Sequence, residues 1–210
     1  MTIKLHCFGE SGNAYKAALT MTLAGVEWEP VFVDFFNGAS RTPEFRALNI
    51  MGEVPVMVDG DLVISQSAVI QDYITSKTSK LGGKSADQRR EVLRWMFFDN
   101  HKISGVAGTL RFNTNFLPEE KRSKEVNDFL LMRLKSALKI METHLENRDW
   151  LATEELTIAD IACCGYLFYP EPFGFERKEF PNIDAWLDRI AATPGWKHPY
   201  DLMQRGLPAA

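Results

Sequence analysis

The sequence has little cysteine and no cysteine spacing typical of a metal site. Cysteine occurs three times among 210 residues, as Cys7, Cys163 and Cys164. Because two of the three are adjacent and the number is odd, they fit neither a disulfide framework nor a zinc site. We therefore expect reduced thiols in a cytoplasmic protein that binds no metal.

Long apolar runs and an excess of positive charge are also absent. No window approaches the roughly 18 apolar residues that a membrane-spanning helix requires, and the start MTIKLHCFGE lacks the basic and apolar regions of a secretory signal. The 24 Lys and Arg residues against 28 Asp and Glu residues give a formal net charge of −4. Nucleic acid and anionic membranes repel an acidic chain, so we expect a globular protein that binds neither.

The N-terminal part of the chain is predicted to alternate between strands and helices and to end in a hairpin. Polar and apolar residues alternate at the start, as in a strand, and Gly25 is placed to end the helix that follows. Asp59-Gly60 between two apolar runs is a strong hairpin signal. The predicted strands are 2–8, 29–34, 54–58 and 62–65, and the predicted helices are 13–24, a short helix from Pro43, and 66–76. A parallel start and an antiparallel hairpin predict one mixed sheet of four strands.

A polar linker is predicted to separate this α/β domain from an all-helical one. The stretch KTSKLGGKSAD at 77–87 has the composition of a linker, and the apolar period beyond it is helical throughout. The predicted helices are 86–113, 119–146, 157–169 and 182–192. We therefore expect an α/β domain at 1–78, a linker at 79–87 and an all-α domain at 88–210.

Val54-Pro55 stands where the third strand begins. Proline donates no backbone hydrogen bond, so it belongs at an edge or at the start of a strand. If this peptide bond is cis, which only proline permits at low cost, Val54 can turn its amide and carbonyl toward a ligand. An extended peptide could then pair with Val54 as an added strand. The simpler interpretation, a trans proline that opens an edge strand, stays open.

Serines at the starts of two predicted helices give two further candidate sites. Ser65-Gln66-Ser67 precedes the third helix, and Ser11-Gly12-Asn13 precedes the first. Each serine can simply cap its helix or punctuate a loop. A helix N-terminus also attracts a carboxylate, so Gln66 and Ser67 could hold the charged end of an amino acid. A hydroxyl at the other helix start could donate to a sulfur anion and so favour a thiolate.

The order of these three features resembles the glutathione S-transferase family. Residues 41–76, beginning RTPEFRALNIMGEVPVMVDGDLVISQSAVI, are similar to that family's Thr-Pro-Glu-Phe, Asn-x-x-Gly-x-Val-Pro and Glu/Gln-Ser-x-x-Ile signatures in the correct order. Ser11-Gly12-Asn13-Ala14-Tyr15-Lys16 resembles the serine-type, bacterial-like branch, in which a serine near the first helix faces the thiol. The resemblance covers nearly the whole chain. It implies a thioredoxin-like α/β domain followed by an all-α domain, with glutathione as co-substrate and a homodimeric assembly.

In the second domain, Leu156-Thr157-Ile158-Ala159-Asp160-Ile161 is similar to the family's helix-start motif. The motif can also be interpreted without the resemblance, because Thr157 is placed to cap the helix and Asp160 sits at the reciprocal position of a capping box. We assign this motif to folding and not to catalysis.

The resemblance implies a role for each residue around the thiol. Ser11 would hydrogen-bond and activate the glutathione sulfur, and Asn13 would assist or replace it. Val54, with Pro55 cis, would pair its backbone with the cysteinyl part of glutathione. Cys7 offers a rival mechanism, because some relatives form mixed disulfides through a cysteine near the first strand, but a buried inert cysteine is the better interpretation.

The two ends of glutathione are assigned by the same resemblance. Gln66 and Ser67 would hold the ammonium and the carboxylate of the γ-glutamyl group. At the glycine end the chain departs from the family, since many relatives carry Lys, Arg or Gln where this chain has Glu53. A glutamate there repels the glycine carboxylate unless it points away, and Arg41 is a possible compensating cation.

The second domain is expected to supply the pocket for the electrophile. His101, Arg111 and Phe112 on its first long helix are the candidates, with Phe116, Tyr166 and Phe168 as further aromatic residues. Aromatic residues at this spacing are more often core than ligand contacts, and His101 is more often a surface or hydrogen-bonded histidine than a proton shuttle. Nothing in these residues identifies the electrophile.

The predicted function is transfer of the glutathione thiolate to a small hydrophobic electrophile, as in detoxification. Catalysis would come from positioning and from stabilising the anion. Because a fold does not settle chemistry, a glutathione-dependent isomerase, peroxidase or disulfide reductase is an alternative. A non-catalytic interaction module is a third possibility, and Glu53 is the feature that favours it.

Overall fold

The structure is a computed structural model that describes residues 2–207. The chain divides into two compact units, Met1–Gly82 together with Pro194–Ala210, and Gly83–Thr193. The sequence places everything from residue 88 onward in the helical domain, but the segment from residue 194 belongs to the first unit. We call residues 194–207 the C-terminal strap.

The first unit contains a four-stranded sheet of order β2-β1-β3-β4, which confirms the predicted mixed sheet. Its strands are β1 (Ile3–Cys7), β2 (Trp28–Phe32), β3 (Val56–Asp59) and β4 (Leu62–Ser65). β1 runs parallel to β2 and antiparallel to β3, with Leu5 opposite Met57. Both of these side chains are fully buried, so this pair lies in the core of the unit.

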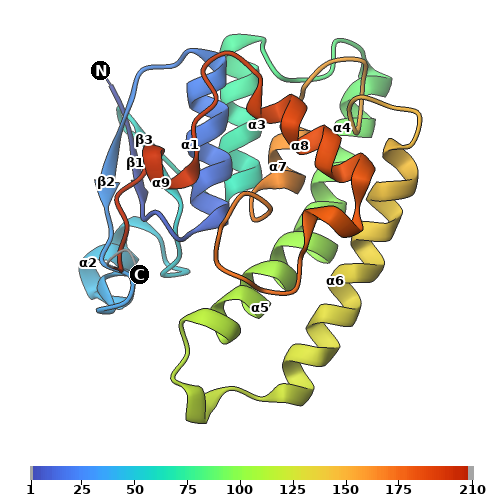
Figure 1. Ribbon diagram of the computed structural model, residues 1–210. Coiled ribbons are helices and arrows are strands. Elements are labelled where there is room, and N and C mark those ends of the chain that lie inside the picture. The colour runs from blue at the N-terminus through green and yellow to red at the C-terminus, as the bar shows by residue number, and fades with distance from the viewer. Residues whose placement is uncertain (1, 208–210) are drawn as a thin grey trace. The chain divides into compact units, whose positions relative to one another are not determined.

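Helices α1 (Gly12–Ala24) and α3 (Ser67–Thr78) lie side by side against the sheet (Figure 1). α1 ends, as predicted, at Gly25, whose φ of 74° is readily adopted only by glycine. Pro43 opens the short helix α2 (Pro43–Leu48), which Thr42 caps after a 3₁₀ turn at Ala39–Arg41. The strap adds a helix that the sequence analysis did not predict, α9 (Pro199–Leu202), and it packs on α1.

The second unit is helical, as predicted, with different breaks. Its helices are α4 (Ala86–Phe98), α5 (Gly105–Asn115), α6 (Lys124–Leu145), α7 (Ile158–Cys164) and α8 (Pro181–Ala191), with 3₁₀ turns at Glu119–Lys121 and Arg177–Glu179. The predicted helix 86–113 is interrupted by a π-helical segment, Asp99–Ser104, in which the Ser104 hydroxyl donates to the buried Asp99 carboxylate at 2.7 Å. The predicted helix 157–169 ends as a regular helix at Cys164.

Asp160 is the polar centre of this helical unit. One carboxylate oxygen accepts hydrogen bonds from the Leu151 amide at 2.8 Å and the Trp186 indole at 3.0 Å. The other accepts from the Thr157 amide at 2.9 Å and the Thr157 hydroxyl at 3.1 Å. Burial raises the pKa of Asp160 above its ordinary value, while these hydrogen bonds act in the opposite direction. The capping box predicted from the sequence is present and joins three segments of the unit.

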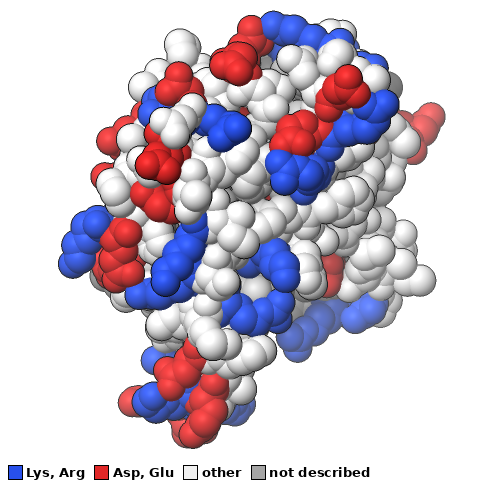
Figure 2. All heavy atoms as spheres, turned by 90° about the vertical axis from the view of Figure 1, so that its right-hand side faces the viewer, with Lys and Arg blue, Asp and Glu red and all other residues white. Residues whose placement is uncertain are grey.

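Charged side chains on α4 and α6 pair locally. Lys124 and Asp128 lie 2.5 Å apart across one helical turn, and Arg94 pairs with Glu91 in the same manner. Figure 2 shows acidic and basic side chains intermixed on the face that it draws. Exposed pairs of this kind contribute about 0–1 kcal/mol each, so they balance charge locally more than they stabilise the fold.

Within residues 2–207, no helix combines the length and the apolar character needed to cross a membrane.

Candidate functional site

Val54 lies immediately before β3 and outside its ladders. The Val54-Pro55 peptide bond is cis, and the first residue of β3 that pairs with β1 and β4 is Val56. Pro55 is buried and Val54 is half-buried. Among residues 2–207, none hydrogen-bonds the backbone amide or carbonyl of Val54. These two groups can therefore pair with an extended peptide.

Gln66 stands between β4 and α3 with a φ of 71°, a region that residues other than glycine seldom adopt. Its side-chain nitrogen, Nε2, lies 3.4 Å from a carboxylate oxygen of Glu53 and 3.1 Å from the sulfur of Met51. The Glu53 carbonyl is in turn held by the Asn49 side chain at 2.8 Å. A rare backbone conformation at a helix start is typical of ligand-binding positions. Gln66 and Glu53, two predicted site residues, are thus brought together.

Ser11 is the N-cap of α1. Its hydroxyl oxygen accepts the Ala14 amide at 3.2 Å, and the residue is 9% exposed. The capping interpretation is therefore correct, but it uses only the acceptor capacity of the hydroxyl, whose proton can still be donated. The positive end of the α1 dipole lies at the same place, which favours an anion there.

Asn13 and Ser67 connect the starts of α1 and α3. The Asn13 side-chain oxygen lies 3.5 Å from the Ser67 hydroxyl, although the two residues are 54 positions apart. Ser67 is the first residue of α3, and Gln66 takes the N-cap position without a side-chain cap bond. The tertiary fold therefore places two of the three sequence features beside each other.

Arg41 is exposed at the end of its 3₁₀ turn. It forms no ion pair with any described residue, so it does not compensate Glu53 within the protein. Glu53 is itself exposed.

None of the three cysteines forms a disulfide with a described residue, and all three are buried. Cys7 lies in β1, and burial raises the pKa of its thiol to about 12. A thiol with that pKa stays protonated and unreactive near neutral pH. Cys163 and Cys164 are fully buried in α7, as the core interpretation predicted.

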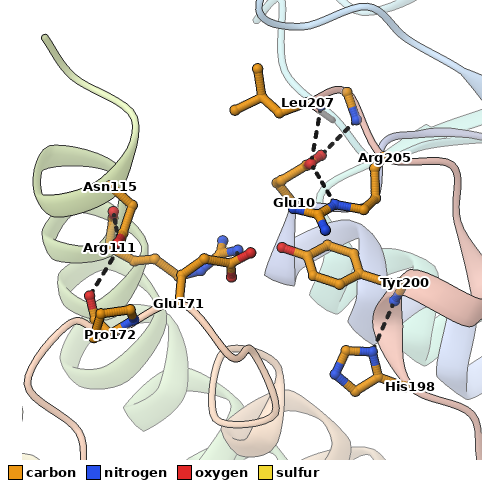
Figure 3. Close-up of polar contacts among 10 residues, drawn as sticks. Glu10, Arg111, Asn115, Glu171, Pro172, His198, Tyr200, Arg205 and Leu207 are labelled. Carbon is orange, nitrogen blue, oxygen red and sulfur yellow. Dashed lines mark hydrogen bonds and ion pairs between the residues drawn. The ribbon is translucent and has the colours of Figure 1, made fainter. Parts of the chain in front are cut away.

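Arg111 of α5 is engaged within the second unit. It is 2% exposed, and its guanidinium lies 2.6 Å from the Glu171 carboxylate (Figure 3). The guanidinium also stacks 3.9 Å from the centre of the Tyr169 ring. Asn115 on the same helix donates to the carbonyls of Arg111 and Pro172. These contacts favour a structural role for Arg111 over substrate contact.

The other predicted pocket residues are more exposed. Phe112 is half-buried and packs edge-on to Phe116, with the ring centres 6.1 Å apart. His101 is exposed in the π-helical segment. A cavity of about 720 Å³ in the same unit contains none of these residues. It is lined by polar side chains that include Arg94, His144, Arg148, Asn182 and Arg189.

Glu10 is a residue of this region that the sequence analysis missed. Its carboxylate accepts hydrogen bonds from the amides of Gly206 at 2.8 Å and Leu207 at 3.2 Å, and pairs with Arg205 at 3.4 Å (Figure 3). The only local signal was an acid placed directly before a serine N-cap. Its partners lie about 195 residues away, so no local pattern could have identified them.

Among the described residues, no group of three or more His, Cys, Asp or Glu side chains is arranged to hold a metal ion.

Comparison with known proteins shows matches along both units. The family model described as "Glutathione S-transferase, N-terminal domain" matches residues 1–76, and "Glutathione S-transferase, C-terminal domain" matches residues 107–194. Glutathione S-transferase F10 of Arabidopsis thaliana is 30% identical over 198 residues, which cover 88% of this chain and 90% of that protein. Glutathione S-transferase 3 of Zea mays is 30% identical over 207 residues, covering 93% and 91%.

Solved structures show the same likeness. A possible glutathione S-transferase from Rhodopseudomonas palustris is 34% identical with a TM-score of 0.86, over 95% of this chain and 90% of that one. A glutathione transferase from Burkholderia graminis, solved with two glutathione molecules per subunit, is 27% identical with a TM-score of 0.83, over 92% and 85%.

Proposed function

The chain belongs to the glutathione S-transferase family, and we propose that it transfers the thiolate of glutathione to a small hydrophobic electrophile through a site around Ser11 and Val54. The observation that carries this proposal is the backbone of Val54, whose amide and carbonyl have no hydrogen-bond partner among residues 2–207. A tripeptide that lies extended can form strand-like hydrogen bonds with these groups.

Ser11 is proposed as the donor to the glutathione sulfur. Its hydroxyl proton is not used by the cap of α1, and the helix dipole also favours the anion. A free thiol has a pKa of about 8.5. Even modest stabilisation of the thiolate therefore makes it a substantial fraction of bound glutathione at neutral pH. Asn13, close to Ser11 in the same helix start, is the proposed second donor.

Gln66 and Ser67 are proposed to hold the γ-glutamyl group. The N-terminus of α3 offers free amides to a carboxylate. The Gln66 side chain at this helix start is the proposed partner of the γ-glutamyl ammonium, through its side-chain oxygen.

At the glycine end of glutathione, we propose that Glu53 weakens binding by repelling the glycine carboxylate. The exposed Arg41 is proposed as the cation that pairs with this carboxylate. For the electrophile, Phe112 and His101 remain the proposed contacts of the second unit. We propose that Arg111 supports the packing around Phe112 and does not contact the electrophile, because its charge is paired with Glu171.

Reduction of mixed disulfides is the second candidate function. Two structural neighbours were solved with more than one glutathione unit, one with two glutathione molecules per subunit and one with oxidised glutathione. The thiolate of a bound glutathione can attack the glutathione sulfur of a mixed disulfide, forming oxidised glutathione and releasing the other sulfur as a thiolate. Isomerase and peroxidase activities would use the same bound thiolate.

The decisive experiment compares conjugation of a chlorinated nitroaromatic with reduction of a mixed disulfide, in the native protein, Ser11→Ala and Cys7→Ala. We expect conjugation that falls strongly in Ser11→Ala and is unchanged in Cys7→Ala. Turnover of the disulfide alone, lost in Cys7→Ala, would instead establish a cysteine-based reductase. Calorimetry with glutathione separates both from a non-catalytic module, since no heat of binding at millimolar ligand means that the site is lost.

A homodimer is proposed from the family membership, and a cytoplasmic location from three cysteines that form no disulfide among the described residues. Exposed apolar side chains on β4 and α3, namely Leu62, Val63 and Val69, are consistent with an association surface. Light scattering coupled to gel filtration measures the mass directly, and a monomer at micromolar concentration would refute the assembly.

A further inference from the structure

The C-terminal strap bonds to the chain on both sides of Ser11. Before Ser11, the Gly9 amide donates to the Gln204 carbonyl at 2.7 Å. After it, the Tyr15 hydroxyl donates to the Lys197 carbonyl at 2.9 Å. In Figure 1 the strap runs beside α1, and α9 packs on that helix. The helix start that carries the proposed thiol donor is thus tied to a segment almost 200 residues away.

Glu10 is the strongest of these ties. Its side chain is 1% exposed, and it accepts from two successive strap amides, those of Gly206 and Leu207 (Figure 3). Arg205 adds an ion pair and stacks 4.1 Å from the centre of the Tyr200 ring. A buried carboxylate is costly unless it is hydrogen-bonded and paired. The strap and the loop therefore determine each other's position.

Gly9 lets the loop approach the strap closely, because any side chain there would force the strap to shift by a few tenths of an ångström. A Cβ atom at this position would lie 3.1 Å from the Gln204 carbonyl oxygen and 3.2 Å from the Arg205 Cα. The neighbours are backbone atoms, which cannot rotate away as a side chain can. Loop and strap thus pack backbone against backbone immediately before Glu10 and Ser11.

We propose that Glu10 is a positioning residue of the thiol site: by holding the strap, it places the Ser11 hydroxyl at the glutathione sulfur. The proposal rests on the proposed function of Ser11. Its physical basis is that a hydrogen bond to an anion depends steeply on distance and angle. A loop released from the strap can still bind glutathione through Val54 and Gln66, but it stabilises the thiolate less well.

The test uses Glu10→Gln, Glu10→Ala and, as a matched control, Glu27→Gln. Gln retains the volume and one acceptor oxygen, so it keeps the protein measurable if Ala does not fold. Glu27 is an exposed glutamate of the same unit whose side chain has no described partner. The readouts are the pKa of bound glutathione from thiolate absorbance, the Kd of S-methylglutathione, which has no ionisable thiol, and the midpoint of urea unfolding.

We expect Glu10→Gln to raise the pKa of bound glutathione by about one unit, which is about tenfold less thiolate at a fixed pH below it. The Kd of S-methylglutathione should stay within about twofold of the native value, and Glu27→Gln should change neither. Because the effect passes through Ser11, Glu10→Gln should add no further shift in a Ser11→Ala background.

A lower unfolding midpoint with an unchanged thiol pKa would overturn the proposal, since the strap would then serve stability alone. Shifts that add fully in the double variant would also overturn it, because Glu10 would act without Ser11. Failure of the proposed function looks different: the native protein would not bind glutathione, or Ser11→Ala would leave the thiol pKa unchanged.

Discussion

Ser11 has two separable tasks, and substitutions can distinguish them. Its oxygen accepts the Ala14 amide at 3.2 Å and so caps α1, while its proton is proposed to reach the glutathione sulfur. Alanine removes both contributions. Glycine removes the hydroxyl but is itself an acceptable N-cap residue, and threonine keeps both.

The two contributions have different magnitudes and appear in different measurements. Loss of a serine cap costs about 0.5–2 kcal/mol with alanine and only about a few tenths with glycine. A hydrogen bond to a charged group is worth about 1.5–3 kcal/mol, which corresponds to about 1–2 units in the pKa of the bound thiol. We therefore expect Ser11→Ala and Ser11→Gly to lose about 10–100-fold in kcat/KM near neutral pH, whereas only Ser11→Ala loses stability appreciably.

The assay is the pH profile of kcat/KM with a chlorinated nitroaromatic, combined with urea unfolding of each variant. Both variants that lack the hydroxyl should move the acidic limb of the profile to higher pH, and Ser11→Thr should stay close to the native curve. The reasoning is refuted if Ser11→Gly keeps native activity and Ser11→Ala loses activity only in proportion to its stability. Ser11 would then be a cap alone, and Asn13→Ala becomes the variant that should shift the profile.

Three further predictions concern other parts of the chain. Glu53→Gln should tighten glutathione binding by about threefold at low salt. The Glu53 carboxylate and the glycine carboxylate of glutathione, if about 6 Å apart in water, repel each other by about 0.7 kcal/mol. Calorimetry should show the gain in affinity shrinking as salt is added. Asp160→Asn should lower the free energy of unfolding by about 2–6 kcal/mol, because the new NH₂ group faces two hydrogen-bond donors and leaves both without an acceptor. Urea unfolding measures this loss. The exposed control Asp149→Asn should lower the free energy of unfolding by less than about 0.5 kcal/mol. Cys7, whose thiol pKa is raised to about 12, should resist alkylation by iodoacetamide at neutral pH until the protein is unfolded, and rapid labelling of the native protein, followed by mass spectrometry, would contradict its burial.

Local chemistry made much of the fold predictable. The Asp59-Gly60 turn, the end of α1 at Gly25 and the capping box at Asp160 depend on residues within about four positions of one another. Such signals act in the unfolded chain as they do in the folded one. The mixed sheet followed from the order of these elements.

The candidate site was predictable in its parts but not in its assembly. The order of Ser11, Val54-Pro55 and Gln66 could be seen in the sequence, and with it the family. The contact between Asn13 and Ser67, and the rare backbone conformation of Gln66, appear only when α1 and α3 lie side by side.

Two assignments needed the tertiary structure. Arg111 was expected in a substrate pocket, but Glu171, sixty positions later, engages its charge. Glu10 gave no signal because its partners, Gly206 and Leu207, lie at the far end of the chain. The sequence by itself thus determined most of the helices, strands and turns, because those are set by near neighbours, but it indicated neither α9 nor the interruption at Asp99–Ser104. Only the folded chain decided which buried charges meet, because those pairings depend on segments that are distant in sequence and close in space.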